Sequence, residues 1–587
     1  QPRRGRESFS VAASSPLGMS RSVGGRYGKR LPTPLRAHLF FRRCERRSTS
    51  APPGGRARRG TWSATETMSI QLPTLEAPRP VSEGIRKRGP SPCISAPVSG
   101  WRRLLGDWAF VGGAEMICQT LGAVTSLLLR MLLDPAQMGI WQAVKLVLSY
   151  ASYANFGVSK GAARELTVAL GRGDLAKATR GLDLAFTANT LSSLAYAVIL
   201  IGAGVWIGLG GSGEWSAAWA LAFIAGGALA ALGRYVSFQV TILRARQAFV
   251  ATSRLSLLEA VTTLAVGGAC TWLWGLPGLY AGTLGVMLAS LVYLSRLETH
   301  RFAFGWDRTE MRRLIAIGSP MLLAGVVYSV FRSLDKLMIL GCMSDREYQL
   351  GCYSLALMVA TQLYGIGNML SIVMGPRYGE KFGRCGDRRQ VALLAARATE
   401  LQAAAIALPA ALALILAGPL LGRLLPDYDS GLAALQWLLP GVVALSLALP
   451  ASQYLIAIDR QKRALAAVLA ATALAAVADY VAIRRQTGLG GLAAATAVGY
   501  LVYFLLAARI SLWPELARAE RWRYAATAVL LPLPTLGLAI VLERTSPAAL
   551  GDWPTILARI AAVLLVWGAT VGAGWRHGGW RDALRRT

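Results

Sequence analysis

Residues 312–360 have the sequence RRLIAIGSPMLLAGVVYSVFRSLDKLMILGCMSDREYQLGCYSLALMVA. A short polar break separates an apolar run at 313–341 from a second run at 350–377. Each run is longer than the roughly 20 residues that an α-helix needs to cross a bilayer. The stretch therefore predicts two antiparallel transmembrane helices joined by a tight loop.

The same alternation of apolar runs and polar breaks extends from Trp108 to the end of the chain. Hydrophobic residues make up 54% of the 587 residues and charged residues 16%, whereas a soluble domain has about 25% charged residues. We therefore predict an all-α polytopic membrane protein. The fourteen helices that we expect span 108–133, 138–159, 181–209, 215–243, 252–275, 277–297, 313–341, 350–377, 392–417, 431–458, 462–483, 489–508, 523–543 and 554–575.

The first hundred residues differ from this membrane body. They contain 19 Lys and Arg, 5 acidic residues and 12 of the 26 prolines, with no apolar run near the length of a membrane helix. We expect residues 1–100 to be a disordered basic extension. Because Met68 lies at a position typical of a translation start, we interpret residues 1–67 as an upstream extension or a processing artefact. The alternative is an organelle transit peptide, which is also rich in Arg and Ser and poor in acids.

The charges of the polar breaks predict the orientation of the helices, because cytoplasmic loops carry an excess of Lys and Arg. Alternate breaks and the C-terminal tail together contain 29 cations, and the intervening breaks contain 5. We therefore interpret the net charge of +31 as a topology signal and expect no nucleic-acid partner. Both termini are predicted to be cytoplasmic. The outward breaks are too short for an external catalytic domain, which argues against a membrane glycosyltransferase or ligase.

Three sequence markers recur at an offset of 210–213 residues, which indicates an internal repeat. They are RRLL at 102–105 with RRLI at 312–315, MGIWQAVKLV at 138–147 with LGCYSLALMV at 350–359, and GRGD at 171–174 with GRCGD at 383–387. An offset of six helices gives both copies the same orientation in the membrane.

The repeat predicts two lobes related in parallel. The predicted parts are an N-lobe at 101–297 with helices 1–6, a C-lobe at 298–511 with helices 7–12, and helices 13–14 with a cytoplasmic tail at 512–587.

Three stretches carry a family resemblance. They are residues 312–360, the junction RMLLDPAQMGIWQAVKLVLSYASYANFGVSKGAARE at 130–165, and YLIAIDRQKRALAAVLAATALAAVADY at 454–480 followed by GLGGLAAATAVGYLVYFLL at 488–506. They resemble polysaccharide flippases of the multidrug, oligosaccharidyl-lipid and polysaccharide exporter superfamily, in which Gly-x-Pro leads to an Asp, a basic residue and a Leu-Gly-x-Tyr-Ser-Leu-Ala helix start. The resemblance covers about residues 102–510. Asp479 stands where the family commonly has Asn.

The resemblance implies a V-shaped bundle of two lobes that works by alternating access. Its substrate would be an undecaprenyl-diphosphate-linked oligosaccharide, moved across the bacterial cytoplasmic (inner) membrane for O-antigen or exopolysaccharide biosynthesis. The implied protein is not an enzyme, has no cofactor beyond coupling to H⁺ or Na⁺, and has the glycan lipid and the bilayer as partners. A polysaccharide polymerase or glycosyltransferases are further candidate partners. The alternatives are a lipid II flippase, whose fourteen helices match the count, and a drug or cation antiporter of the same superfamily.

Polar side chains recur at helical spacing on equivalent helices of both predicted lobes. A sugar and a diphosphate cannot cross hydrocarbon unaided, so these stripes indicate a hydrated central cavity. The uncharged residues that we expect to line it are Gln119, Gln142, Tyr328, Thr361 and Asn368.

Cations on the same helices are candidates for binding a diphosphate. They are Lys145, Arg332, Arg234, Arg130 and Lys336. An ion inside the membrane costs roughly 2.5–3.5 kcal/mol on insertion scales, so each needs a partner or water. Lys145 and Arg332 lie at similar depth on helices 2 and 7, and Arg binds phosphate oxygens bidentately. For Arg130 and Lys336, which are near helix ends, the alternative is snorkelling to the interface.

Two acidic residues within the membrane are candidates for coupling or internal pairing. Glu115 has no cation one turn away on its own helix, so we predict that it acts as a proton- or sodium-linked switch. Asp335 lies one turn from Arg332 and beside Lys336, which predicts an internal ion pair. The seven Cys form no C-x-x-C pair and the three His are scattered, which argues against a metal site.

The charge bias leads to a topology prediction. A reporter fused after Arg389 should be cytoplasmic, and one inserted at 342–351 should be external, because the first break is cation-rich and the second is not. Reporter activity on each side of the membrane measures the outcome. Either fusion on the opposite side would contradict the fourteen-helix topology.

Overall fold

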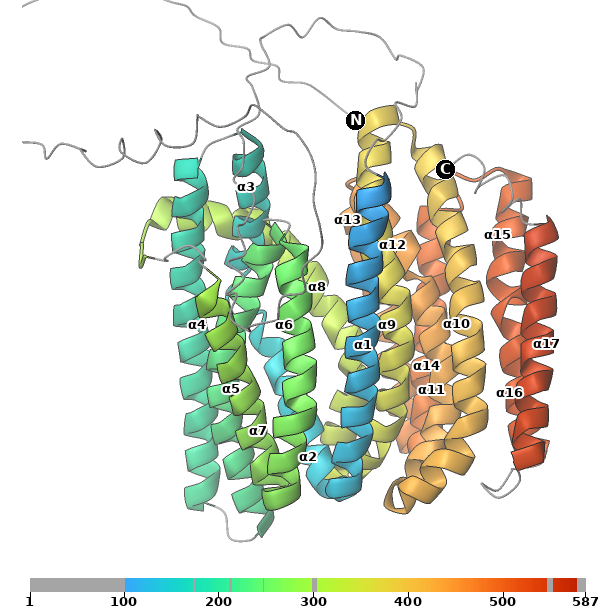
Figure 1. The fold of residues 1–587 in the computed structure, drawn as a ribbon, viewed down its shortest axis with the longest axis horizontal. Coiled ribbons are helices and arrows are strands. Elements are labelled where there is room, and N and C mark those ends of the chain that lie inside the picture. Colours follow the sequence, from blue (N-terminus) through green and yellow to red (C-terminus); the bar gives the residue numbers. More distant parts are fainter. Residues whose placement is uncertain are drawn as a thin grey trace, which may run out of the picture. The chain divides into compact units, whose positions relative to one another are not determined.

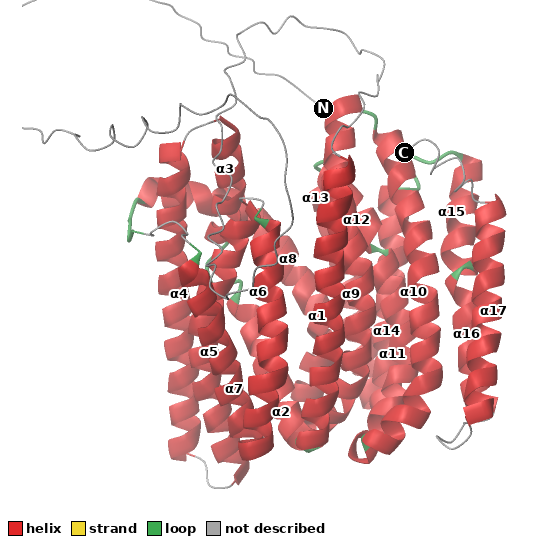
Figure 2. Cartoon of the chain, viewed as in Figure 1, coloured by secondary structure: helices red, strands yellow, loops and turns green. Residues whose placement is uncertain are grey.

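The computed structural model describes residues 101–172, 175–210, 214–245, 248–297, 303–545 and 553–577. These residues form helices and connecting turns, with no strand among them (Figure 1; Figure 2). The prediction of an all-α polytopic membrane protein is confirmed. The predicted extension 1–100 and the tail beyond residue 577 lie outside the described residues.

The helices follow the predicted order along the chain. The predicted N-lobe contains α1 (Trp101–Leu132), α2 (Pro135–Ala151), α3 (Val158–Arg172), α4 (Leu175–Gly210), α5 (Glu214–Ala245), α6 (Phe249–Thr262), a π-helical turn (Thr263–Gly267) and α7 (Gly268–Arg296). The predicted C-lobe contains α8 (Arg308–Cys342), α9 (Arg346–Cys385), α10 (Arg388–Leu424), a 3₁₀ turn (Pro426–Tyr428), α11 (Ser430–Leu447), α12 (Leu449–Ala457), α13 (Gln461–Arg484) and α14 (Gly488–Ser511). The last helices are α15 (Arg518–Leu530), α16 (Pro532–Thr545) and α17 (Trp553–His577). Below, the inner end of a helix is the one predicted to be cytoplasmic, and the outer end is the opposite one.

The fourteen predicted membrane helices are accounted for. Twelve helical stretches of the described chain are long and apolar enough to cross a membrane. The stretch of 47 residues at Val250–Arg296 reverses direction at Gly275, where φ is 60° and ψ is −135°, and so provides two of the predicted helices. Beyond the turn, Gly278 packs on the backbone of Cys270 in the first arm. The fourteenth helix is α2, which has 17 residues.

The prediction of the second helix, at 138–159, was wrong at the inner end of the helix. Helix α2 ends at Ala151, and a turn leads to α3, which occupies the segment predicted to be a loop. In the turn, Phe156 and Gly157 have φ of 50° and 85°, and the Gly157 amide donates to Asn155 Oδ1 at 3.2 Å. A Cβ on Gly157 would lie 2.7 Å from the carbonyl carbon of Gly318 in α8. Apolar periodicity continues across this turn and does not reveal it, because contact with α8 determines where the chain bends.

Helices α2 and α9 cross at their outer ends through a pair of equivalent glycines. Gly139 packs on the backbone carbonyl of Glu347, and Gly351 packs on that of Pro135. Gly139 and Gly351 are 212 residues apart in the sequence, and so are Pro135 and Glu347. Each contact is therefore the repeat equivalent of the other, as at an isologous interface. This is the pattern that a local two-fold relation between the predicted lobes would produce, although the lobe boundaries themselves remain a prediction.

Helix α8 packs with helices of both predicted lobes. Near its inner end, Met311 and Leu314 belong to a buried cluster with residues of α3, α4 and α5. Near its outer end, Phe331 and Ile339 belong to the large core cluster that includes α9, α11 and α14. Pro320 lies between the two halves. Since one helix contributes to both clusters, α8 connects the two parts of the bundle.

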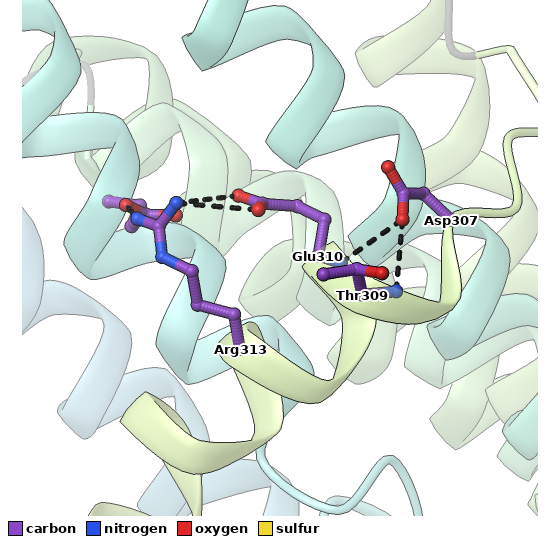
Figure 3. Close-up of polar contacts among 5 residues, drawn as sticks. Asp307, Thr309, Glu310 and Arg313 are labelled. Carbon is purple, nitrogen blue, oxygen red and sulfur yellow. Dashed lines mark hydrogen bonds and ion pairs between the residues drawn. The ribbon is translucent and has the colours of Figure 1, made fainter. Parts of the chain in front are cut away.

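Polar contacts hold the beginning of α8 in place (Figure 3). The carboxylate of Asp307 caps the helix by accepting from the amides of Thr309 and Glu310 at 3.0 and 3.2 Å. Arg313 pairs with Glu310 one turn before it, at 3.1 Å, and with Glu165 of α3. The inner end of α8 is thereby tied to α3.

The glycine crossing leads to a stability prediction. Gly351→Val should destabilise the protein by about 1–3 kcal/mol, because the new side chain would overlap the backbone of Pro135. Gly139→Val should have the same effect at the equivalent contact. Gly341→Val is the control, since no atom lies within 4 Å of a Cβ at that position. The thermal unfolding midpoint of the purified protein in detergent measures the effect, and equal midpoints for all three variants would contradict the close crossing.

Candidate functional site

Lys145 and Arg332 lie at the same depth in the bundle. Lys145 is ten residues from the outer start of α2, and Arg332 is ten residues from the outer end of α8. At 1.5 Å per residue both Cα atoms are about 15 Å inside, near the middle of a 30 Å hydrocarbon core. The two helices touch, since the hydroxyls of Tyr150 and Ser333 are 2.6 Å apart. Each predicted lobe thus contributes a cation near the middle of a helix expected to cross the membrane.

Arg332 stacks on an aromatic ring. Its guanidinium carbon lies 3.9 Å from the ring centroid of Tyr364 in α9. Within the described chain, Arg332 makes no hydrogen bond or ion pair. Its nitrogens are not fully buried. The predicted ion pair with Asp335 is therefore not formed, although the two side chains are close enough for their charges to interact. The N–H groups of Arg332 remain available to an anion.

Lys145 is exposed and has further cations near it. Its ammonium lies 5.7 Å from the ring centroid of Trp141. Arg130 and Lys336 are close enough for their charges to act on it, and Lys336 in turn is affected by Arg332. Four of the five predicted cations therefore belong to one electrostatically connected group that involves α1, α2 and α8.

The other two arginines of the prediction are already engaged by the protein. Arg130 is buried, and its guanidinium donates to Ser126 at 2.6 Å and to the carbonyl of Ser354 in α9 at 2.7 Å. Arg234 in α5 donates to Asn189 Oδ1 at 2.5 Å. Arg130 therefore joins α1 to α9, and Arg234 joins α5 to α4. Neither arginine is as available to a ligand as Arg332 or Lys145.

The contact made by Arg130 is one of several that close the outer end. The Trp219 indole donates to Glu347 Oε1 at 3.0 Å, and the Tyr428 hydroxyl donates to the carbonyl of Leu133 at 2.8 Å. Both bonds join a helix or turn of one predicted lobe to the other. Together with the glycine crossing, they hold the outer ends of α2 and α9 together.

The uncharged residues of the predicted cavity have different surroundings. The Gln119 amide packs on Gly365 of α9, and Gln142 is buried with its amide 3.8 Å from Met138 Sδ. Thr361 is exposed and donates to its own helix, at the carbonyl of Leu357. The remaining two are Tyr328, which hydrogen-bonds Tyr364 at 3.0 Å, and Asn368, which is half-buried. A lining role for these residues remains a prediction.

Two buried carboxyl groups lie near each other in the predicted C-lobe. Asp335 in α8 accepts from the Tyr353 hydroxyl and from the Lys336 amide, both at 2.8 Å. Asp479 in α13 accepts from the Thr496 hydroxyl of α14 at 3.2 Å, and its other oxygen is buried without a partner. The two carboxyl groups are close enough for their charges to interact. Two buried like charges repel, and Asp335 already has Arg332 and Lys336 close enough to act on it. A proton or a cation near Asp479 would offset the remaining repulsion.

Glu115, the predicted coupling residue, lacks such surroundings. It is exposed and makes no hydrogen bond or ion pair within the described chain. Asp479 stood out in the sequence only as a departure from the family pattern. The signal that should have identified it is its position as a lone acid in an apolar run, because an ionisable residue inside the membrane is a functional candidate by default.

A family profile described as "Polysaccharide biosynthesis protein" matches residues 128–426, just over half of the chain. The chain belongs to the polysaccharide biosynthesis protein family. The matched segment contains the glycine crossing, Lys145, Arg332 and Tyr364. No curated protein sequence matches the chain.

Solved structures with the same fold include both flippases and exporters. A lipid II flippase, MurJ, in an inward closed conformation aligns with a TM-score of 0.60 at 14% identity, covering 79% of this chain and 98% of its own. A mutant of the Vibrio cholerae MATE transporter VcmN aligns with a TM-score of 0.54 at 15% identity, covering 70% and 95%. A MATE transporter of the MOP superfamily in an inward-facing conformation has a TM-score of 0.52 at 16% identity, covering 70% and 95%. Identities this low establish the fold alone.

Family and fold together confirm the predicted superfamily. This family member is a multi-pass membrane protein that shares its fold with flippases and exporters. The solved structures with this fold that are described above are all of transporters. Within the described residues, no group of three or more His, Cys, Asp and Glu side chains is placed to hold a metal ion.

Proposed function

We propose that the protein flips an undecaprenyl-diphosphate-linked oligosaccharide across the bacterial cytoplasmic membrane by alternating access, for polysaccharide biosynthesis or export. The observation that carries the proposal is the pair of available cations at mid-membrane, Lys145 on α2 and Arg332 on α8. A diphosphate carries about two negative charges and loses its hydration on entering the membrane. Cations from both predicted lobes replace that hydration, Arg by two parallel hydrogen bonds. Family membership supports a glycan precursor as the cargo.

A second candidate is a lipid II flippase. It is favoured by the fold shared with MurJ, whose chain is covered to 98%. Lipid II also carries a diphosphate, so the cation pair suits both cargoes. The sugar portion distinguishes them. A drug or cation antiporter is less well supported, because unpaired cations at mid-membrane repel a cationic drug.

We also propose that the carboxyl pair of Asp335 and Asp479 couples transport to H⁺ or Na⁺. The unpartnered oxygen of Asp479 lies near a second buried carboxylate, and the hydroxyls of Tyr353 and Thr496 add oxygen atoms to the site. Oxygen ligands suit hard cations. Asp335 is one turn from Arg332 on α8, so a change of charge at the pair acts directly on the proposed anion site. This assignment replaces Glu115 as the favoured coupling residue.

Export by variants tests the anion site. Arg332→Ala and Lys145→Ala should each lower substrate affinity roughly ten- to a hundredfold, since a charged hydrogen bond contributes about 1.5–3 kcal/mol. Arg332→Lys should retain part of the export, and Arg332→Glu should abolish it. Lys462→Ala, which removes an exposed cation at the inner start of α13, is the control. Surface polysaccharide is measured in a strain lacking its own polysaccharide flippase, at matched membrane abundance.

The same variants in a second strain decide between the cargoes. Rescue of a strain depleted of its lipid II flippase, without rescue of the polysaccharide strain, would favour the second candidate. Normal export by Arg332→Glu in both strains would contradict the anion site.

Cation dependence tests the coupling site. Sodium chloride should raise the thermal unfolding midpoint of the purified protein relative to choline chloride of equal ionic strength, because a ligand that binds the folded state stabilises it. Asp335→Asn and Asp479→Asn should remove this difference, and Asp345→Asn, an exposed acid, should keep it. If the coupling ion is a proton, the unfolding midpoint of the wild type should depend on pH and not on sodium. This pH dependence should disappear in the same two variants. A wild-type protein insensitive to both would overturn the coupling proposal.

A further inference from the structure

Arg332 differs from the other arginines of the predicted site in how it is held. Arg130 and Arg234 are tied by hydrogen bonds to serine and asparagine groups, and the Nε atom of each is buried without a partner. Arg332 has no such bond within the described chain, and only the ring of Tyr364 supports it, at 3.9 Å. At that separation the guanidinium carbon is in contact with the face of the ring, which is the distance of a stacked arginine. The stack orients the group without consuming its donors.

The ring of Tyr364 is itself held by a network of aromatic and hydroxyl groups. Its hydroxyl is 3.0 Å from that of Tyr328 in α8. The Tyr328 ring lies 6.1 Å from that of Tyr503 in α14, whose hydroxyl is 2.7 Å from Ser452 in α12. Tyr503 is buried, and its ring also contacts Phe331 at a centroid distance of 5.3 Å. Four helices of the predicted C-lobe therefore determine where the Tyr364 ring lies.

We propose that Tyr364, held by Tyr328, is a positioning residue that aims the guanidinium edge of Arg332 and so makes the site selective for a diphosphate over a monophosphate. The proposal rests on the proposed function, because it assumes that Arg332 binds the anion of the cargo. A flexible arginine neutralises any phosphate as a point charge. An arginine with a fixed plane presents two parallel donors, which a diphosphate can accept on neighbouring phosphoryl groups.

A double-mutant cycle measures the coupling between the two residues. The probes are farnesyl diphosphate and farnesyl monophosphate, titrated into the purified full chain in detergent, with Kd read by calorimetry. Tyr364→Leu should weaken diphosphate binding about tenfold, a loss between those expected for an exposed and a desolvated cation–π contact, and monophosphate binding much less. Tyr364→Phe keeps the ring and should cost about two- to threefold. In an Arg332→Lys background, Tyr364→Leu should have little further effect, because lysine presents no plane to orient.

A matched control exists on α13. Arg484 lies 5.3 Å from the ring centroid of Tyr480 and donates to its hydroxyl at 2.8 Å. Tyr480→Leu therefore removes an arginine–tyrosine contact at an exposed position and should leave both affinities unchanged. Equal losses from Tyr364→Leu in the wild-type and Arg332→Lys backgrounds, or equal losses for both probes, would assign Tyr364 a packing role and overturn the inference. If the wild-type chain binds neither probe, the proposed function fails. If the wild-type chain prefers the diphosphate but the effects of Tyr364→Leu and Arg332→Lys are additive, the role of Tyr364 is overturned and the proposed function stands.

Discussion

The cost of placing a charge inside a bilayer shapes much of this structure. Each ionised side chain within the membrane needs a partner or water. Arg130, Arg234 and Arg559 meet this need with groups on neighbouring helices, namely the Ser354 carbonyl, Asn189 and Glu543. Each such contact joins two helices. Arg332 makes no hydrogen bond or ion pair within the described chain and stacks on the Tyr364 ring, which keeps its donors available. The contrast supports the proposal that Arg332 binds a ligand.

Close backbone contacts provide the second organising feature. Without a hydrophobic driving force between helices in lipid, small residues allow the dense packing that holds them together. Gly139 and Gly351 bring α2 and α9 into contact at the outer end, while Gly157 and Gly318 bring the turn before α3 against α8. Tyr153 of that turn and Lys160 of α3 add hydrogen bonds to carbonyls of α8, at 3.0 and 3.3 Å. Alternating access would require one of these contacts to open while the other remains closed.

Helix α8 carries the groups that connect these features. Its inner half packs with α3, α4 and α5, its outer half packs in the large core, and Pro320 lies between them. Asp335 and Arg332 occupy the outer half, one turn apart. A cation held near Asp335 and an anion held by Arg332 would therefore act on the same helix. This arrangement gives the proposed coupling a short physical path.

Much of the fold was predictable from the sequence because length and hydropathy determine which segments can cross a membrane. The runs at 313–341 and 350–377 became α8 and α9, and the repeat offset relates Gly139 to Gly351, the two glycines of the crossing. The break at 152–157 was not predictable, since its conformation depends on the approach of Gly318. Counting residues from the outer helix ends was enough to predict that Lys145 and Arg332 lie at similar depth.

The sequence by itself determined the membrane class, the number of helices and the residues able to carry charge to mid-membrane. Only the tertiary structure decided how each charge is used. Spacing along one helix predicted that Asp335 pairs with Arg332, yet Asp335 accepts from Tyr353 of α9 and lies near Asp479 of α13. Arg332 stacks instead on Tyr364. The physical reason is that helical periodicity tells which side chains share a face, whereas the partner across that face comes from another helix, whose position depends on packing.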